Sequence, residues 1–320
     1  MIPPLNEMGR YPVTAGIVVI AAVIFLFAGS AGADLLTLDL RAYEGEPWRI
    51  LSTAFVHAGF WGEDSMYGGL MHFGFNAYWC LYLAPPLEQR WGHLRLASFI
   101  IAAATVSSVA EYAFLHTPVG LSGVVYAFAG ARWYVQKQDP RFRPRLEPRV
   151  YQLLGFWFVF CIALTVSEMM PIANIAHGVG ALMGVALAAA GMGPTKHRIG
   201  AGLGLTLALG VYALAAPALR PAVNLGEVQG LDHLGLAERA FSKPDYLEAE
   251  RQLKACLRYP RCPATANYNL GVAYARLGRL EDAHKAFAEA AEREPGNLTY
   301  SRERDELGAF LVEQGKAKTP

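Results

Sequence analysis

Charged residues are scarce in this sequence. Asp, Glu, Lys and Arg make up only 17% of its 320 residues, and 28 basic against 27 acidic side chains leave a net charge of +1. No basic patch with interleaved aromatic residues is present, so we expect no nucleic-acid partner. Hydrophobic residues instead make up 53% of the chain, and the mean hydropathy is +0.23. This composition is more apolar than that of an average soluble protein.

The apolar residues are unevenly distributed along the chain. Residues 226–320 carry much of the charge and contain no run long enough to cross a bilayer. Residues 13 to about 219 form a series of such runs, which predicts an all-α fold: a polytopic membrane helical bundle followed by a more polar domain. The predicted spans are 13–29, 68–86, 94–115, 120–137, 151–168, 171–191 and 199–219.

Lysine and arginine in the short loops predict the orientation of these spans. If the spans alternate, only Arg41 and Arg49 fall on one side. The opposite side, which should be the cytoplasm, receives Arg10, Arg90, Arg95, Lys137, Arg141, Arg143, Arg145, Arg149, Lys196 and Arg198. This bias places the N-terminus in the cytoplasm and residues 226–320 outside. Residues 10–33 also resemble a signal peptide, but we expect this first span to be retained.

Cysteine is also scarce, with four residues in the chain. Cys80 and Cys161 lie singly in predicted spans and are most simply packing residues. Cys256 and Cys262 lie in the outer domain with five residues between them. An oxidising compartment would permit a disulfide between them. The spacing is equally compatible with two separate thiols, because geometry decides whether they pair.

The outer domain contains a repeat signature. Residues 264–297 match the 34-residue tetratricopeptide pattern at its packing positions, which are Leu270, Gly271, Tyr274, Ala283, Phe287, Ala290 and Pro295. A degenerate copy precedes it, from about Leu234 to Pro260, and a final helix near 299–314 should cap the stack. The pattern predicts a small α-solenoid that binds an unknown peptide or protein ligand or docks on the membrane domain.

Ser122 and His177 are the most informative polar residues of the apolar segments. A polar side chain inside a bilayer has no water to bond, so such residues are usually functional. Ser122 stands between Gly120 and Gly123 at a predicted loop-to-helix boundary, where free N–H groups and the helix dipole can hold an oxyanion. A Gly-x-Ser-Gly motif alone is more often a packing motif. His177 favours a functional serine instead, since it is predicted to lie at about the same depth in the membrane as Ser122.

Small residues give the two helices a way to meet. They recur at four-residue spacing in both spans: Gly123, Ala127 and Ala131 in one, and Ala176, Gly180, Gly184 and Ala188 in the other. Such stripes let helices approach closely. Because Ser122 and His177 each adjoin the first residue of a stripe, the pattern predicts a dyad. His177 would take the Ser122 proton, and Ser122 would attack a peptide carbonyl.

Three other residues support this chemistry. His72 and Asn76, four residues apart on one face of the second span, are placed to donate to an oxyanion. Alternatively, His72 is a surface residue and Asn76 an interhelical hydrogen-bond donor. No acidic residue adjoins His177, but Tyr126, one turn after Ser122, could stack on the imidazole and orient it. The pattern implies no metal and no cofactor.

Together these motifs resemble the rhomboid family of intramembrane serine proteases. The resemblance covers residues 10 to about 195 and is closest to bacterial forms at residues 120–127. The motifs that carry it are Trp48-Arg49, residues 52–57, His72 with Asn76, Leu87-Glu88 with Gly92, residues 120–126, and Ala176-His177 with Gly180 and Gly184. The implied organisation is a rhomboid-like domain at 1–195, a seventh span and linker at 196–225, and the repeat domain at 226–320.

The resemblance also implies roles and partners. The dyad would be Ser122 and His177, the oxyanion donors His72 and Asn76, and the scaffold of the first loop Trp48 and Arg49. Substrates would be single-span membrane proteins that enter sideways from the lipid bilayer, in a bacterial inner membrane. The fifth span, with residues 156–158, would be the gate, unless its aromatic side chains simply face lipid.

The sequence departs from the family pattern in two places. Residues 58–71 form a longer insert between His57 and His72 than the family usually has, and a longer lid would restrict access to the site. Ala84-Pro85 stands where the family often has glycine, which predicts a bend in the helix. Glu88 is expected to be structural, and Glu111 is a buried acid without an assigned role.

Two other functional classes compete with a protease. An inactive rhomboid-like domain could anchor the repeats as an adaptor, although the presence of all four polar positions argues against this. A transporter would need a polar path through the midplane of the bilayer, whereas these polar residues are confined to one end of the spans.

Overall fold

The chain divides into two compact units, Met1–Leu225 and Gly226–Pro320. The structure, a computed structural model, describes residues 2–57, 66–167, 169–170, 172–192, 195–216, 219–225 and 230–317. Every regular element within these ranges is a helix. The all-α class predicted from the sequence is therefore confirmed for the described part of the chain.

Each predicted span corresponds to a helix of the first unit, and the predicted ends differ from the observed ends by five residues at most. These helices are α1 (Pro12–Phe27), α4 (Met66–Leu83), α6 (His93–Phe114), α7 (Ser122–Gln138), α8 (Pro148–Val166), α9 (Asn174–Met192) and α10 (Thr195–Leu214). Within the described ranges, α6, α8, α9 and α10 are long and apolar enough to cross a membrane, and α1 is apolar but shorter.

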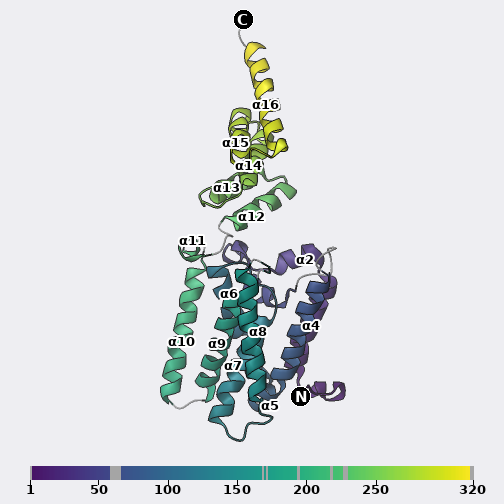
Figure 1. Ribbon diagram of the computed structural model, residues 1–320, viewed down its shortest axis with the longest axis vertical. Coiled ribbons are helices and arrows are strands. Elements are labelled where there is room, and N and C mark those ends of the chain that lie inside the picture. Colours follow the sequence, from purple (N-terminus) through teal and green to yellow (C-terminus); the bar gives the residue numbers. More distant parts are fainter. Residues whose placement is uncertain are drawn as a thin grey trace. The chain divides into compact units, whose positions relative to one another are not determined.

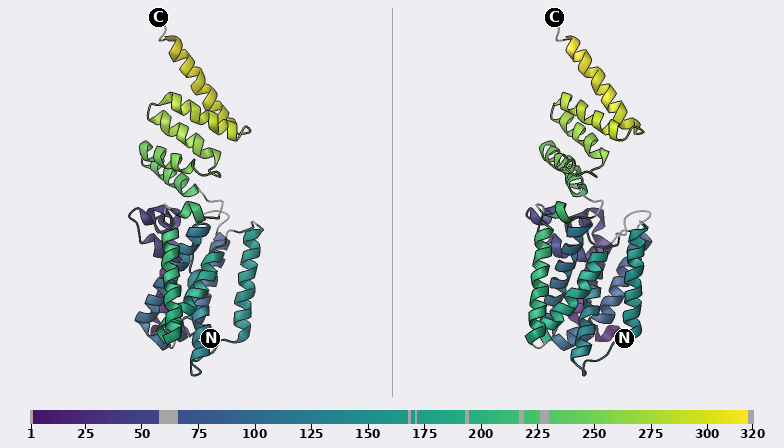
Figure 2. Two further views of the ribbon diagram at one scale, coloured as in Figure 1. Left: turned by 90° about the vertical axis from the view of Figure 1, so that its left-hand side faces the viewer. Right: turned by 60° about the vertical axis from the view of Figure 1, so that its left-hand side comes forward.

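Helix α6 forms the interior of the bundle and packs against α7, α9 and α10 (Figure 1). Its inner positions are mostly small, including the fully buried Ala103 and Ala110, so neighbouring helices can approach it closely. Helix α8 lies at the edge of the bundle (Figure 2). Only Leu154 and Cys161 are buried along its length, which leaves most of its surface for lipid.

The second span ends in a break, as Ala84-Pro85 predicts. Helix α4 stops at Leu83, and the short helix α5 (Pro85–Trp91) follows, because proline cannot donate the next helical hydrogen bond. The break positions Glu88, whose buried carboxylate accepts hydrogen bonds from the backbone N–H of Val13 and of Thr14, each at 2.9 Å. Glu88 therefore caps the N-terminus of α1 and has the expected structural role.

The first loop is a series of short helices held together by Arg49. These are α2 (Gly29–Leu36), η2 (Leu40–Tyr43), α3 (Arg49–Ser52) and η3 (Thr53–Phe55). A further short helix, η1 (Leu5–Arg10), lies before α1 and outside this loop. The Arg49 guanidinium is fully buried and donates to the carbonyls of Asp34 at 2.5 Å and Thr37 at 2.9 Å. The Trp48 indole donates to Leu35 O at 3.3 Å. Both residues thus tie α3 to α2, while residues 58–65 of the insert lie outside the described residues.

The seventh span is joined to the bundle at its far end. The short helix α11 (Arg220–Val223) follows α10, and Arg220 Nε donates to Tyr112 O at 2.7 Å. The Asn224 amide donates to Leu115 O at 2.8 Å. These bonds satisfy carbonyls at the C-terminus of α6, which have no partners within their own helix.

The second unit is a stack of helical pairs (Figure 2). Its helices are α12 (Leu231–Ser242), α13 (Tyr246–Cys256), α14 (Ala264–Arg276), α15 (Leu280–Arg293) and α16 (Leu298–Ala317). A Cβ added at Gly271 would lie 2.6 Å from Phe287 Cδ1, so glycine allows α14 and α15 to pack closely, as the repeat pattern predicts. Cys256 and Cys262 form a disulfide beside the turn that links the two helical pairs.

Candidate functional site

Ser122 is the first residue of α7, and the loop before it is held in place. Gly120 has a φ of +95°, a conformation that other residues rarely adopt. Its N–H donates to Thr53 O at 3.2 Å, and the Thr53 hydroxyl donates to Pro118 O. The first loop therefore positions the turn that places the Ser122 hydroxyl at the N-terminus of α7, where backbone N–H groups lack helical acceptors.

His177 on α9 meets Ser122 directly. The imidazole Nε2 lies 2.8 Å from Ser122 Oγ, and only 4% of the His177 surface is exposed. Its Nδ1 is buried and has no hydrogen-bond partner within the described ranges. A neutral imidazole that accepts the serine proton at this distance can generate an alkoxide nucleophile.

Tyr126 lies against His177 in the manner that its position on α7 predicts. The two rings stack with centroids 4.7 Å apart and an angle of 23° between their planes. The Tyr126 hydroxyl donates to Leu154 O on α8 at 3.2 Å. Stacking restricts rotation of the imidazole, and the hydrogen bond in turn fixes the phenol ring.

Glycine allows α7 and α9 to pack backbone to backbone. A Cβ added at Gly180 would overlap the carbonyl of Gly123, and one added at Gly184 would overlap the carbonyl of Ala127. Gly123 itself has no room for a Cβ, because the Ser107 side chain on α6 lies against it. The small-residue stripes seen in the sequence thus face each other and bring Ser122 and His177 together.

His72 and Asn76 on α4 face the same turn. A Cβ added at Gly120 would lie 2.6 Å from His72 Nε2 and 3.4 Å from Asn76 Nδ2. The Asn76 amide also donates to His72 O at 3.0 Å, and only 3% of its surface is exposed. Both side chains therefore point toward the backbone two residues before Ser122.

His57 belongs to this cluster, although no sequence motif alone assigns it a role. Its Nε2 lies 3.4 Å from Asn76 Nδ2, its ring centroid lies 4.9 Å from that of His72, and it is almost fully buried. The sequence feature that could have identified His57 is its position at the end of residues 52–57, one of the motifs that carry the family resemblance. Contact with Asn76 and His72 across the insert is not visible in a linear sequence.

Glu111 was identified as a buried acid without a role, and the structure gives it a partner. Its carboxylate on α6 is fully buried, and Oε2 accepts a hydrogen bond from Ala176 N at 3.0 Å. The His116 Nε2 lies 3.5 Å from the other carboxylate oxygen. Ala176 is in the first turn of α9, directly before His177. Glu111 thus caps the N-terminus of the helix that carries the histidine.

The described residues contain no group of three or more His, Cys, Asp or Glu side chains placed to hold a metal ion. The chemistry available at this site is that of a serine hydroxyl, an imidazole and surrounding hydrogen-bond donors. Its residues come from α4, α6, α7 and α9 and from the first loop.

Comparison with known proteins finds matches to both units of the chain. Residues 65–193 match the family model described as "Rhomboid domain", and residues 264–297 match the model described as "Tetratricopeptide repeat". A protein named "Rhomboid protease GlpG" from Serratia proteamaculans is 31% identical over 194 residues, which cover 58% of this chain and 64% of that protein. The protein of the same name from Klebsiella pneumoniae is 31% identical over 184 residues.

The matches cover only part of this chain and part of each relative. The Klebsiella match covers 55% of this chain and 62% of that protein, so the similarity spans less than two thirds of these relatives. The matched family model covers α4 to α9, the helices that supply Ser122, His177, His72 and Asn76. This chain is therefore a multi-pass membrane protein in which residues 65–193 match a rhomboid domain and residues 264–297 match a tetratricopeptide repeat.

Proposed function

We propose that this protein is an intramembrane serine endopeptidase in which Ser122 and His177 form the catalytic dyad. The observation that carries the proposal is the 2.8 Å approach of His177 Nε2 to Ser122 Oγ within helices of a rhomboid domain. The identity to proteins named rhomboid proteases supports the same reaction class.

In the proposed first step, His177 Nε2 accepts the Ser122 proton as Oγ attacks a peptide carbonyl carbon. The carbonyl oxygen becomes an oxyanion at the N-terminus of α7. Backbone N–H groups there and the side chains of His72 and Asn76 donate hydrogen bonds to it. The approach of His72 and Asn76 to Gly120 supports donors that are in position before the charge develops.

In the second step, the protonated His177 transfers its proton to the leaving amine, and the C–N bond breaks. Water then attacks the acyl-enzyme, with His177 as general base, and releases the carboxyl product and Ser122. Tyr126 keeps the imidazole plane fixed through both proton transfers, since no carboxylate contacts Nδ1 in the described part of the chain.

The proposed substrates are single-span membrane proteins cleaved near the outer leaflet. Helix α8 is the proposed gate, because it packs loosely at the edge of the bundle while its inner face adjoins the dyad. Phe158 lies 6.4 Å from the His177 ring and 5.8 Å from the Tyr126 ring, measured between centroids. Phe156 is largely exposed and would face lipid.

The proposed orientation places the N-terminus in the cytoplasm of a bacterial inner membrane and the repeat unit outside. The basic loops support this orientation, and the Cys256–Cys262 disulfide supports an oxidising compartment for the second unit. The repeat unit would bind a substrate or another protein partner, as helical solenoids commonly do.

The proposed function is tested with the purified full-length protein in lipid vesicles that contain a tagged single-span substrate. We expect two fragments whose new ends, identified by mass spectrometry, lie in or beside the outer half of the transmembrane segment. The proposal is contradicted if a panel of such substrates stays uncut under conditions in which a known rhomboid protease cuts them. That result would favour the adaptor function.

Tyr126→Phe and Tyr126→Leu separate stacking from hydrogen bonding. Phenylalanine keeps the ring over His177 and loses only the bond to Leu154 O, so we expect a fall in kcat of no more than about threefold. Leucine removes an aromatic contact worth about 1 kcal/mol, which corresponds to a fall of about tenfold. Cleavage rates of the two variants at equal folded concentration decide this, and equal loss in both would contradict an orienting role for the ring.

Replacement of Glu111 tests whether the cap on α9 positions His177. Glu111→Leu removes the acceptor for Ala176 N, and a displacement of the catalytic base by about 1 Å costs on the order of 100-fold in rate. We expect kcat to fall about 10- to 100-fold with KM little changed, because the Glu111 side chain is fully buried. Glu111→Gln keeps an acceptor oxygen and should retain most of the activity.

Glu88→Leu is the matched control for Glu111→Leu, since Glu88 is an equally buried carboxylate that caps α1 rather than α9. It should lower the melting temperature of the protein while kcat of the folded protein stays unchanged. If kcat fell equally in the Glu88 and Glu111 variants, Glu111 would act through the stability of the protein and not through the position of His177.

A further inference from the structure

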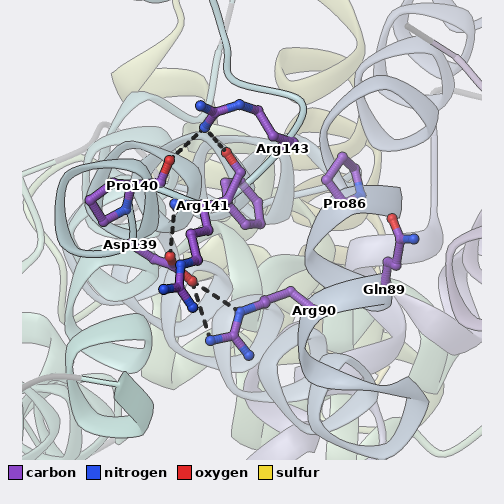
Figure 3. Close-up of a pocket in the computed structure, with 8 residues that line it drawn as sticks. Pro86, Gln89, Arg90, Asp139, Pro140, Arg141 and Arg143 are labelled. Carbon is purple, nitrogen blue, oxygen red and sulfur yellow. Dashed lines mark hydrogen bonds and ion pairs between the residues drawn. The ribbon is translucent and has the colours of Figure 1, made fainter.

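A shallow basic pocket lies at the end of α7 opposite Ser122. Its walls come from α5 and from the loop between α7 and α8, and its volume is about 920 Å³. The lining contains three arginines, Arg90, Arg141 and Arg143, and one acid, Asp139. Figure 3 shows Arg90 joined to Asp139 by hydrogen bonds, with Arg143 at the opposite side of the pocket.

The single acid does not balance this charge. Asp139 Oδ2 accepts two bonds from Arg90, each at 3.3 Å. Arg143 Nη1 donates only to backbone carbonyls, those of Pro140 at 2.7 Å and Phe142 at 2.9 Å. The Arg141 guanidinium makes no hydrogen bond or ion pair with the described residues. Within the ranges that the structure describes, two guanidinium charges are therefore left without a carboxylate.

A buried cation behind the pocket adds to its positive potential. Arg132 on α7 is 1% exposed, and its guanidinium carbon lies 5.6 Å from the ring centroid of Phe142, a lining residue. Its hydrogen bonds go to the carbonyls of Tyr82 and Pro144, and it forms no ion pair with a carboxylate of the described residues. A buried charge without a counterion raises the free energy of the protein, so an anion in the pocket would stabilise it.

Neighbouring side chains place the pocket at the level of the lipid headgroups. Trp133, five residues before the end of α7, is 42% exposed, and the Lys137 ammonium lies 4.0 Å from the centroid of its ring. Exposed tryptophan and lysine near the end of a membrane helix mark the boundary between hydrocarbon and headgroups. We therefore expect the loop that follows Gln138 to lie near the phosphates of the adjacent leaflet.

We propose that this pocket binds the phosphate group of an anionic phospholipid. Arg141 and Arg143 supply planar, bidentate donors that match phosphate oxygens, and Arg132 contributes the field of its charge from below. Basic pockets between membrane helices are suited to such headgroups. Arg90 and Asp139 form the side of the site, and a lipid bound here would fasten α5 to the α7–α8 loop.

The test uses the full-length protein in detergent, titrated with phosphatidylglycerol or phosphatidylcholine and observed by native mass spectrometry. We expect wild-type protein to retain phosphatidylglycerol preferentially and the Arg141→Gln/Arg143→Gln variant to bind it about 10-fold more weakly. The matched control is Arg95→Gln, an exposed arginine at the same end of the bundle, and its affinity should not change. An equal loss in the control would show general surface attraction and overturn the proposal.

A second arm distinguishes lipid from soluble phosphate. Inorganic phosphate at low millimolar concentration should leave the bound phosphatidylglycerol in place. Displacement of the lipid by phosphate alone would assign the pocket to a soluble phosphate compound and contradict a lipid site. If the double variant does not fold, Arg141→Gln carries the same test with a smaller loss, because the Arg141 side chain has no partner in the described protein to lose.

Discussion

Ser122→Ala should lower the rate of substrate cleavage by roughly 10⁴-fold or more while leaving the protein folded. Removal of a serine nucleophile eliminates the acyl-enzyme route, and the remaining oxyanion donors alone supply only a small part of the rate enhancement. Among the described residues the hydroxyl bonds only to His177 Nε2, so its loss should change the melting temperature by little.

Ser98→Ala provides the matched control for this prediction. Ser98 is an exposed serine of α6 whose hydroxyl bonds only to Leu94 O of its own helix. This variant should cleave at the wild-type rate. If purified Ser122→Ala protein still cleaved at that rate, the nucleophile would have to be another group.

Gly184→Val should abolish activity by forcing α9 away from α7. A Cβ at this position would overlap the Ala127 carbonyl, and the atom it meets belongs to backbone and not to a flexible side chain. Overpacking of a tight helix contact costs about 1–3 kcal/mol or more. The clash is relieved only if the helices separate, which moves His177 away from Ser122. We expect a lower melting temperature and a fall in cleavage of at least about 100-fold.

The control for this substitution lies on the same helix. Gly191 has no atom within 4 Å of an added Cβ, so Gly191→Val introduces the same side chain into α9 without a clash. It should keep the activity and thermal stability of the wild-type protein. Comparable losses in both variants would mean that valine disturbs α9 itself, and the close contact with α7 would not explain the effect.

Much of the fold and of the site could be predicted from the sequence, because apolar membrane segments have few structural options. Apolar runs in a bilayer must be helices, because no water satisfies exposed backbone groups, and the predicted spans therefore coincide with helices. Small residues at four-residue spacing predicted which faces meet, and Gly180 and Gly184 do contact the backbone of α7. Stacking of Tyr126 on His177 followed from the rise of one helical turn.

The remaining features depend on contacts between distant segments. Glu111 was recognisable as a costly buried acid, but its bond to Ala176 joins residues 65 positions apart, and no local pattern indicates such a partner. His57 reaches Asn76 only because the chain returns across the insert. Arg132 also depends on distant contacts. The sequence shows a basic residue in the helix, but only the structure shows that no carboxylate of the described residues pairs with it.

Covalent labelling of Ser122 tests the dyad most directly. Wild-type protein in lipid vesicles is treated with a fluorophosphonate probe, and the modified residue is identified by peptide mass spectrometry, alongside His177→Ala protein and a known rhomboid protease. The dyad predicts modification at Ser122 in the wild type and loss of labelling in His177→Ala. A wild-type protein that stays unlabelled while the known protease reacts, or that is modified at a serine other than Ser122, would contradict it.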